Sequence, residues 1–196
     1  MEKATLAGCK KNAQRLGAHL VFVDESGFLL LPLIAKTWSL RGKTPIVRHW
    51  TWPRDKVSVI SGVTISPIHH RLNLSYAIHS NTNIAGPQVE AFVLTLLRAL
   101  RGPIVLLWDG SKTHQTQRIR QICSRNPRLI VERFPPYAPE LNPDEGVWSL
   151  TKRDLANSRF DNREQLETRV REVLEFTRRS PVRLRGCLHA TRLKFF

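Results

Sequence analysis

A short, continuous apolar run is the feature that most constrains how this chain can fold. Residues 104 to 108 read Ile-Val-Leu-Leu-Trp and lie between Gly102-Pro103 and Asp109-Gly110. Both dipeptides interrupt regular structure, so the run is too short for a helix and fits a strand. A strand with apolar side chains on both faces is typical of the centre of a sheet that is covered by helices on each side. The run therefore predicts an α/β fold.

The neighbouring segments predict a mixed sheet around this strand. Three β-rich stretches precede it, at residues 20–23, 57–65 and 71–78, and the link Ser-Pro-Ile-His-His between the last two is typical of a hairpin. A further strand is predicted at 128–131. Helices are predicted by apolar stripes and capping residues over residues 86–100, 113–124, 142–156 and 162–178. This order predicts antiparallel strands first and parallel strands later.

We expect one domain in the 196 residues, because neither a repeat nor a second core is visible. Residues 19–180 would form it, after a short basic lead-in at 1–18 and before a basic C-terminal tail at 181–196. The longest apolar run is too short to cross a membrane, and the charged N-terminal segment does not resemble a signal peptide. The three cysteines are far apart, which argues against structural zinc and fits a reducing, cytoplasmic compartment.

The charge of the chain indicates a class of partner. There are 31 Lys and Arg residues against 16 Asp and Glu residues, for a net charge of +15. A strongly basic folded domain most often binds nucleic acid, although a basic surface without function is the alternative. A membrane surface is disfavoured, because the charge is spread along the chain instead of lying on one amphipathic helix.

Acidic residues occur where a sheet of this kind places its ligands. Asp24 is predicted to end the first strand, Asp109 ends the central strand, and Asp144 and Glu145 open the helix after the proline-rich segment 134–143. Converging carboxylates repel one another unless a divalent cation lies between them, and oxygen ligands suit Mg²⁺ or Mn²⁺. Two such ions can drive phosphodiester cleavage. The alternative is that each aspartate merely caps a loop.

Helical geometry favours Glu145 over its neighbour only weakly. Glu145, Trp148 and Lys152 would share one helix face, so Trp148 would pack beside Glu145 while Lys152 could reach a phosphate. On this reading, Asp144→Ala should have a mild effect. Asp24 and Glu25 would point to opposite faces if the strand continues through both.

Three sequence blocks resemble a known family. The blocks are VDESG, WDGSKTH and PPYAPELNPDEGVWSLTKR, within residues 19–155. They are similar to the catalytic domain of cut-and-paste transposases of the mariner superfamily, in its bacterial insertion-sequence branch. The resemblance implies a ribonuclease H-like fold, in which Asp24, Asp109 and Glu145 are catalytic and bind two Mg²⁺ or Mn²⁺ ions. It also implies a nucleoid-associated bacterial protein.

The resemblance further implies hydrolysis at transposon ends, followed by transfer of the freed 3′-hydroxyl into target DNA. Glu25 would support the site, and His114 would contact a phosphate, position water or simply pack on the sheet. Lys152 and Arg153 are candidate DNA contacts, as are Arg159, Arg178 and Arg179. Residues 28–56 occupy the region where relatives insert a segment that clamps the partner subunit, so a homodimer is expected. Trp38, Trp50 and Trp52 lie there and could stack on a partner or on DNA, although for Trp38 burial as a core anchor is the favoured expectation.

One departure concerns how DNA would be read. Relatives carry an N-terminal helix-turn-helix region, and some 18 residues precede the first strand here, so we expect a separate helix-turn-helix chain or a truncated copy. Two further readings stay open. One is another ribonuclease H-like nuclease, and the other is a non-catalytic DNA-binding remnant.

Overall fold

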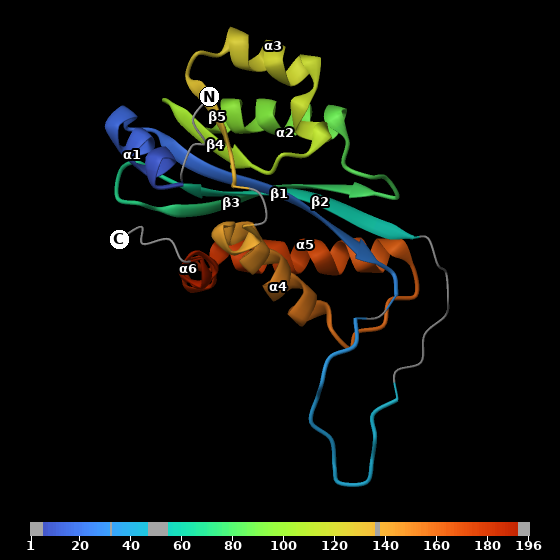
Figure 1. The fold of residues 1–196 in the computed structure, drawn as a ribbon. Helices are drawn as coiled ribbons and strands as arrows, with labels where there is room; N and C mark the ends of the chain where they lie inside the picture. Colours follow the sequence, from blue (N-terminus) through green and yellow to red (C-terminus); the bar gives the residue numbers. More distant parts are fainter. Residues whose placement is uncertain (1–5, 32, 47–54, 136–137, 192–196) are drawn as a thin grey trace.

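The computed structural model describes residues 6–31, 33–46, 55–135 and 138–191. A five-stranded sheet in the order β3-β2-β1-β4-β5 forms its centre, and helices cover both faces (Figure 1). β1 pairs antiparallel with β2 and parallel with β4, β2 pairs antiparallel with β3, and β4 pairs parallel with β5. The predicted mixed sheet, with antiparallel strands first and parallel strands later, is confirmed.

The strands and helices have the following bounds. The strands are β1 His19–Leu29, β2 Lys56–Ile65, β3 Leu72–Ser80, β4 Ile104–Trp108 and β5 Leu129–Arg133. The helices are α1 Leu6–Leu16, α2 Gly86–Ala99, α3 Gln117–Arg125, α4 Pro143–Leu155, α5 Arg163–Arg179 and α6 Pro181–Ala190. Two short 3-10 turns are η1 Lys112–Gln115 and η2 Pro139–Leu141.

Two layers of helices bury the two faces of the sheet. The helices α2 and α3 lie on one face, and α4, α5 and α6 lie on the other (Figure 1). Every residue of β4 is buried, as the apolar run predicted. Val21 and Val23 of β1 pack in the cluster with α2 and α3, whereas Phe28 packs in the cluster with α4, α5 and α6. The alternation along β1 therefore assigns successive side chains to opposite layers.

The first strand is longer than predicted. We expected it to end at Asp24 before a Ser-Gly turn, but β1 continues to Leu29. The partner strand explains the difference, because β2 pairs with β1 as far as Leu29↔Lys56 and Phe28 beyond the Ser-Gly pair is buried. Ladder hydrogen bonds and burial outweigh the local turn preference of Ser-Gly. Asp24 consequently lies in the middle of a strand.

Two other segments differ from the prediction. Residues 113–124, expected to form one helix, are divided at Thr116 into η1 and α3, because the Thr116 side chain accepts the Ile119 N–H and caps the second helix. Residues 181–190, expected to belong to a basic tail, form α6. Leu184, Cys187 and Leu188 of this helix are buried. Within the described residues, no helix is both long enough and apolar enough to span a membrane.

Candidate active site

Asp24 lies on the face of β1 that α4 covers. The Trp148 indole of α4 donates a hydrogen bond from Nε1 to Asp24 Oδ2 at 3.1 Å, and its ring packs edge-on against Phe28. Burial raises the pKa of Asp24 to about 6, against the lowering effect of the Trp148 hydrogen bond. The charges of Glu145 and Glu25 raise this pKa further. The folded environment of Asp24 therefore disfavours its ionised form.

The start of α4 is anchored to the sheet beside Asp24. Asn142 caps the helix by accepting the Asp144 N–H, and the Asp144 carboxylate accepts hydrogen bonds from Ser61 Oγ and from Val63 N, the latter at 3.4 Å. Ser61 of β2 is the direct partner of Asp24 across the ladder. Asp144 is fully buried, and this burial raises its pKa well above the ordinary range. These contacts fix where the helix begins.

Glu145 has the opposite environment from its neighbour. It is exposed, one residue further along α4, and its charge raises the pKa of Asp24. Glu145 and Asp24 are thus brought within electrostatic range by the anchoring of α4. Of the two adjacent acids, Asp144 is committed to β2 and Glu145 faces solvent beside Asp24.

Asp109 follows β4, next to β1. The parallel ladder pairs Phe22 with Leu107, so continuing the register by two residues puts Asp109 opposite Asp24. Adjacent strands lie about 4.8 Å apart. The Asp109 side chain is 60% exposed, and its Oδ1 accepts the Ser111 N–H at 2.8 Å. The two aspartates therefore share one edge of the parallel pair.

His114 in η1 bridges two of the predicted site residues. Its Nδ1 lies 2.9 Å from Asp109 Oδ1, and its Nε2 lies 2.8 Å from Glu25 Oε1. The side chain is only 1% exposed, and the ring stacks on Trp108 with 4.5 Å between centroids. Burial lowers the pKa of His114, but the hydrogen bond and charge of Glu25 together with Asp109 outweigh burial, so the net pKa is raised. The ring nitrogen Nε2 hydrogen-bonds the Glu25 carboxylate, and Nδ1 lies 3.3 Å from the backbone carbonyl oxygen of Asp109.

Glu25 confirms the alternation expected at this point of β1. Asp24 bonds to α4 on one face, and Glu25 bonds to η1 on the other.

The two predicted basic residues of α4 are exposed, and Arg153 lies 3.6 Å from Asp154. Lys152 and Arg153 therefore present their charges to solvent.

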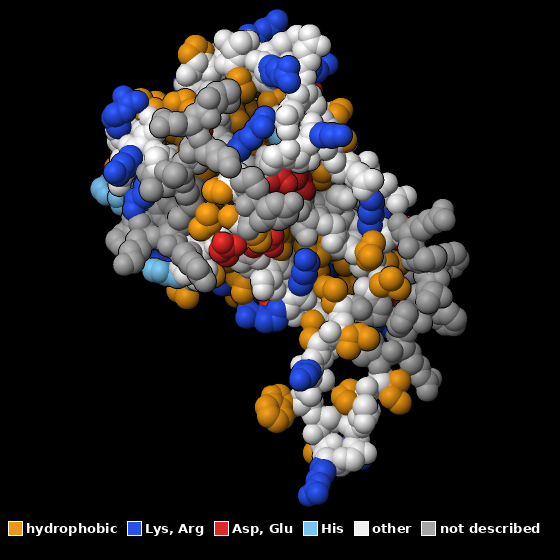
Figure 2. Space-filling model, viewed as in Figure 1, with side chains coloured by type: hydrophobic (Ala, Val, Ile, Leu, Met, Phe, Trp, Pro, Cys, Tyr) orange, Lys and Arg blue, Asp and Glu red, His pale blue; other side chains and the backbone are white. Residues whose placement is uncertain are grey.

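The acidic residues share one region without forming a finished metal site. In the described part of the chain, no three His, Cys, Asp or Glu side chains are grouped closely enough to hold an ion. Asp24 and Glu145 interact with each other, and Asp109 is instead turned to His114. Figure 2 shows acidic side chains gathered near the centre of this face of the molecule.

The long segment before β2 projects away from the sheet (Figure 1). Trp38 is 99% exposed, so its predicted burial as a core anchor is wrong. The described residues around it, 33–46, are exposed as well. Trp50 and Trp52 lie outside the described residues.

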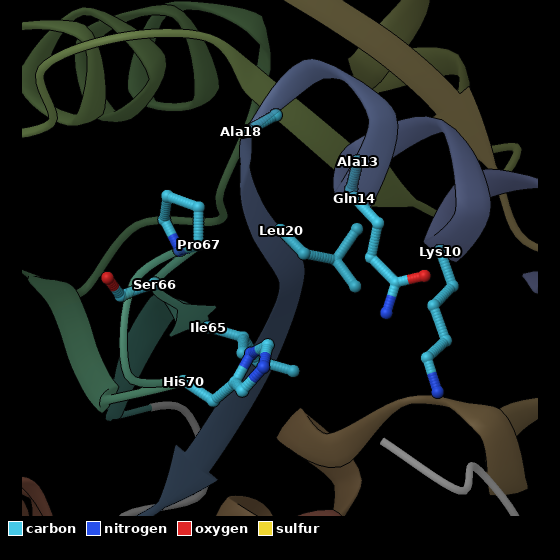
Figure 3. A pocket seen from close by; sticks show the side chains of 10 residues that line it. Lys10, Ala13, Gln14, Ala18, Leu20, Ile65, Ser66, Pro67 and His70 are labelled. Carbon is cyan, nitrogen blue, oxygen red and sulfur yellow. The ribbon is translucent and has the colours of Figure 1, made fainter. Parts of the chain in front are cut away.

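A pocket of about 380 Å³ lies between α1 and the β2–β3 turn (Figure 3). Its floor includes Leu20 and Ile65, and Lys10, Gln14 and His70 stand at its edge. No acidic residue lines it, so it is separate from the acidic region.

Sequence reasoning missed the residues that support the site. Ser61 and Val63 hold Asp144, and the indole of Trp148 bonds to Asp24 instead of only packing beside Glu145. Ser61 is a polar residue within an apolar strand, which is a signal for a buried polar contact. Its partner is 83 positions away, so the sequence alone does not name it.

Comparison with solved structures shows what this fold is similar to. The chain matches the Mos1 strand transfer complex with a TM-score of 0.58 and 17% identity, over 96% of this chain and 60% of that one. It matches a pre-cleavage Mos1 transpososome with a TM-score of 0.61 and 16% identity, over 95% and 60%. The Mos1 mariner transposase catalytic domain is matched with a TM-score of 0.54 and 15% identity, over 94% and 90%.

These likenesses confirm the ribonuclease H-like fold. The chain spans about 60% of the length of the Mos1 chains in those two complexes. No sequence match was found among curated proteins. The family model described as DDE superfamily endonuclease matches residues 19–167, which include all three candidate acids. A match over most of the chain, together with this fold, shows that the chain belongs to the DDE superfamily endonuclease family.

Proposed function

We propose that this chain is the catalytic domain of a DNA transposase. It would hydrolyse a phosphodiester at transposon ends and transfer the freed strand into target DNA. The observation that carries the proposal is the pairing of Asp24 of β1 with Glu145 of α4, beside Asp109 at the end of the neighbouring strand β4, in a chain of the DDE endonuclease family. The solved structures of similar fold include Mos1 strand transfer and paired-end complexes.

Divalent ions fit the chemistry of these residues. The three side chains supply only carboxylate oxygens, which suit Mg²⁺ or Mn²⁺. Burial and the Glu145 charge disfavour ionised Asp24, and a bound cation would reverse that preference. Mos1 complexes have been solved with Mg and with Mn. When bound, two ions would activate the attacking oxygen and stabilise the leaving oxygen.

The protein's own residues would prepare Asp109 for this task. The Ser111 N–H donates to Oδ1 of Asp109, and His114 Nδ1 lies 2.9 Å from the same oxygen, so Oδ2 would be the atom offered to a ligand. The carboxylate of Glu25 hydrogen-bonds the other nitrogen of His114. We therefore propose that Glu25 and His114 are positioning residues that fix the direction of the Asp109 carboxylate.

The third acid is proposed to be Glu145. Asp144 is buried, and its two carboxylate oxygens accept hydrogen bonds from Ser61 and Val63, which supports a structural role. Glu145 is exposed to incoming substrate and adjacent to Asp24. Trp148 would hold the Asp24 carboxyl in place through its indole N–H.

Partners follow from the same proposal. The proposed substrate is DNA, and on the resemblance to the bacterial branch the protein would act at the nucleoid. Ile34, Trp38, Leu40 and Ile46 are largely exposed on the projecting segment, and exposed apolar side chains of this number favour a protein contact. We propose that a second copy of the chain covers them in the DNA complex. A separate helix-turn-helix chain that reads the transposon ends stays a prediction of the resemblance.

The test compares acid-to-amide variants in nicking and strand-transfer assays with Mg²⁺. Asp24→Asn, Asp109→Asn and Glu145→Gln should each abolish cleavage while DNA binding is kept. Glu140→Gln is the control, because Glu140 is an exposed acid in η2 close to Glu145 in sequence. Cleavage by all three variants at the parent rate would overturn the proposal. DNA binding by the parent without any cleavage would favour the non-catalytic remnant instead.

A further inference from the structure

The arginines of α5 are neutralised by glutamates of the same helix. The guanidinium–carboxylate distances in its five pairs run from 2.7 to 3.5 Å. The pairs are Arg163–Glu164, Arg169–Glu172, Arg171–Glu167, Arg178–Glu175 and Arg179–Glu175. A phosphate would have to compete with a carboxylate for each of these cations. The basic composition of α5 therefore overstates its attraction for DNA.

The segment made of η1 and α3 has the opposite character. It carries Lys112, Arg118, Arg120 and Arg125 and no acidic residue. Arg118 lies 3.4 Å from Glu90 of α2. The other three cations are exposed, and within the described ranges none of them has an acidic partner. Three uncompensated charges thus lie on a segment of 14 residues, 112 to 125.

The position of this segment matters as much as its charge. Lys112 is three residues after Asp109, so the segment starts at the acidic edge of the sheet. The axis of α3 then covers about 12 Å at 1.5 Å per residue, which corresponds to the rise of three to four base pairs. Figure 2 shows Lys and Arg side chains above the acidic side chains, over the region that α3 forms in Figure 1.

The exposed arc of α3 is suited to the sugar–phosphate backbone. Arg120 and Arg125 are about 140° apart around the helix axis and flank the arc. Gln121 lies between them, is exposed, and can donate to a phosphate oxygen. Ile119 on the inner side is buried against the sheet, so the helix presents these side chains from a fixed base.

We propose that η1 and α3 form the track that holds the DNA phosphate backbone next to the acidic site. Lys112, Arg120 and Arg125 would be its phosphate contacts, whereas the arginines of α5 would contribute little. A site with several carboxylates repels DNA, and unpaired cations on the adjoining segment offset this repulsion. The inference rests on the proposed function for its choice of partner, and it departs from the expectation that Arg178 and Arg179 contact phosphates.

The test measures the salt dependence of binding to a duplex of about 30 base pairs and arbitrary sequence. Fluorescence anisotropy would give Kd between 50 and 200 mM salt in EDTA, so that cleavage does not interfere. The first variant combines Lys112→Gln, Arg120→Gln and Arg125→Gln. The matched control combines Arg169→Gln, Arg171→Gln and Arg178→Gln, which removes the same three charges from α5.

The two variants should differ clearly. Each lost phosphate contact lowers the slope of log Kd against log salt by about 0.9. The slope of the α3 variant should therefore be smaller than the parent slope by between about 2 and 3. Over this salt range, the parent would lose up to about 40-fold more affinity than the α3 variant. The α5 control should change the slope by less than about 1. Circular dichroism would establish that both variants are folded.

The inference would be overturned if the two variants had equal slopes. It would also be overturned if the α3 variant were folded and had the same slope as the parent. Neither result depends on catalysis. The proposed function fails separately if the Asp24, Asp109 and Glu145 variants cleave DNA normally. A single variant, Arg120→Glu, repeats the test if the triple variant does not fold, and an unchanged Kd for it would also overturn the inference.

Discussion

The buried carboxyl of Asp24 makes a prediction about stability that is independent of any cleavage assay. At neutral pH the Asp24 carboxylate is ionised in the unfolded chain, and folding transfers this charge into a partly buried site; Asp24→Asn removes that cost. The asparagine keeps the size of the side chain, and its Oδ1 can still accept the Trp148 N–H. We expect the variant to be more stable than the parent in the absence of metal.

The magnitude follows from the pKa. Asp24 has a pKa of about 6 in the folded protein, against a reference value of 3.8. The folded state binds the Asp24 proton more tightly than the unfolded state does. The stability that this proton contributes is therefore fully present below about pH 4 and is lost as the pH rises through about 6. The loss is about 1.5 kcal/mol at pH 5 and about 3 kcal/mol at pH 8, as upper values. The advantage of Asp24→Asn should grow by the same amounts.

Urea unfolding in EDTA, followed by tryptophan fluorescence between pH 5 and pH 8, measures this difference. Asp109→Asn is the matched control, because it makes the same chemical change at the same edge on an exposed side chain. The control should show no comparable gain. Adding Mg²⁺ should stabilise the parent more than Asp24→Asn, because a ligand that binds the folded state raises its stability.

Two results would refute the reasoning. One is an Asp24→Asn protein that is no more stable than the parent at pH 8. The other is a gain of the same size at pH 5 and pH 8, since the cost of ionisation must grow over that interval.

Three further predictions concern α4. Asp144→Ala should lower the free energy of unfolding by about 1–3 kcal/mol in urea titrations, because it leaves the buried Ser61 hydroxyl and Val63 N–H of β2 without this acceptor; an unchanged free energy of unfolding would contradict this. Gly146→Ala should lower the free energy of unfolding by about 1–3 kcal/mol in the same assay, because the added Cβ would lie 2.8 Å from Cys187 Cα. The control is Gly186→Ala, whose Cβ would meet nothing within 4 Å and which should leave the free energy of unfolding nearly unchanged. Glu145→Asp should strongly reduce the nicking rate with little effect on stability, because the shorter side chain withdraws its oxygens by about 1 Å; a parent-like rate would exclude Glu145 as a ligand.

Much of the fold was predictable because local pattern and tertiary packing agree. The β4 run was predicted at the residues where it is found, since its apolar composition and its Gly-Pro and Asp-Gly boundaries leave no other regular structure. The α4 and α5 helices begin after the predicted cap at Asn142 and after Asn162, because both side chains accept backbone N–H groups. Capping acts over three residues and can be read from the sequence.

The prediction was wrong where long-range packing outweighs local preference. β1 passes through its Ser-Gly pair because β2 supplies a full ladder, and residues 181–190 form a helix that buries Leu184, Cys187 and Leu188. Trp38 was expected to be a buried core anchor, and within the described residues it is 99% exposed.

The sequence by itself determined most of the strands and helices, the family resemblance and the set of acids, because those depend on periodicity, caps and short motifs. Only the tertiary structure showed that Asp144 is buried and bonded to β2 while Glu145 is exposed, since those hydrogen bonds reach a strand more than 80 positions away. The number of basic residues is likewise read from the sequence, but their pairing is not. Whether each arginine is free or paired depends on the carboxylates that folding brings beside it.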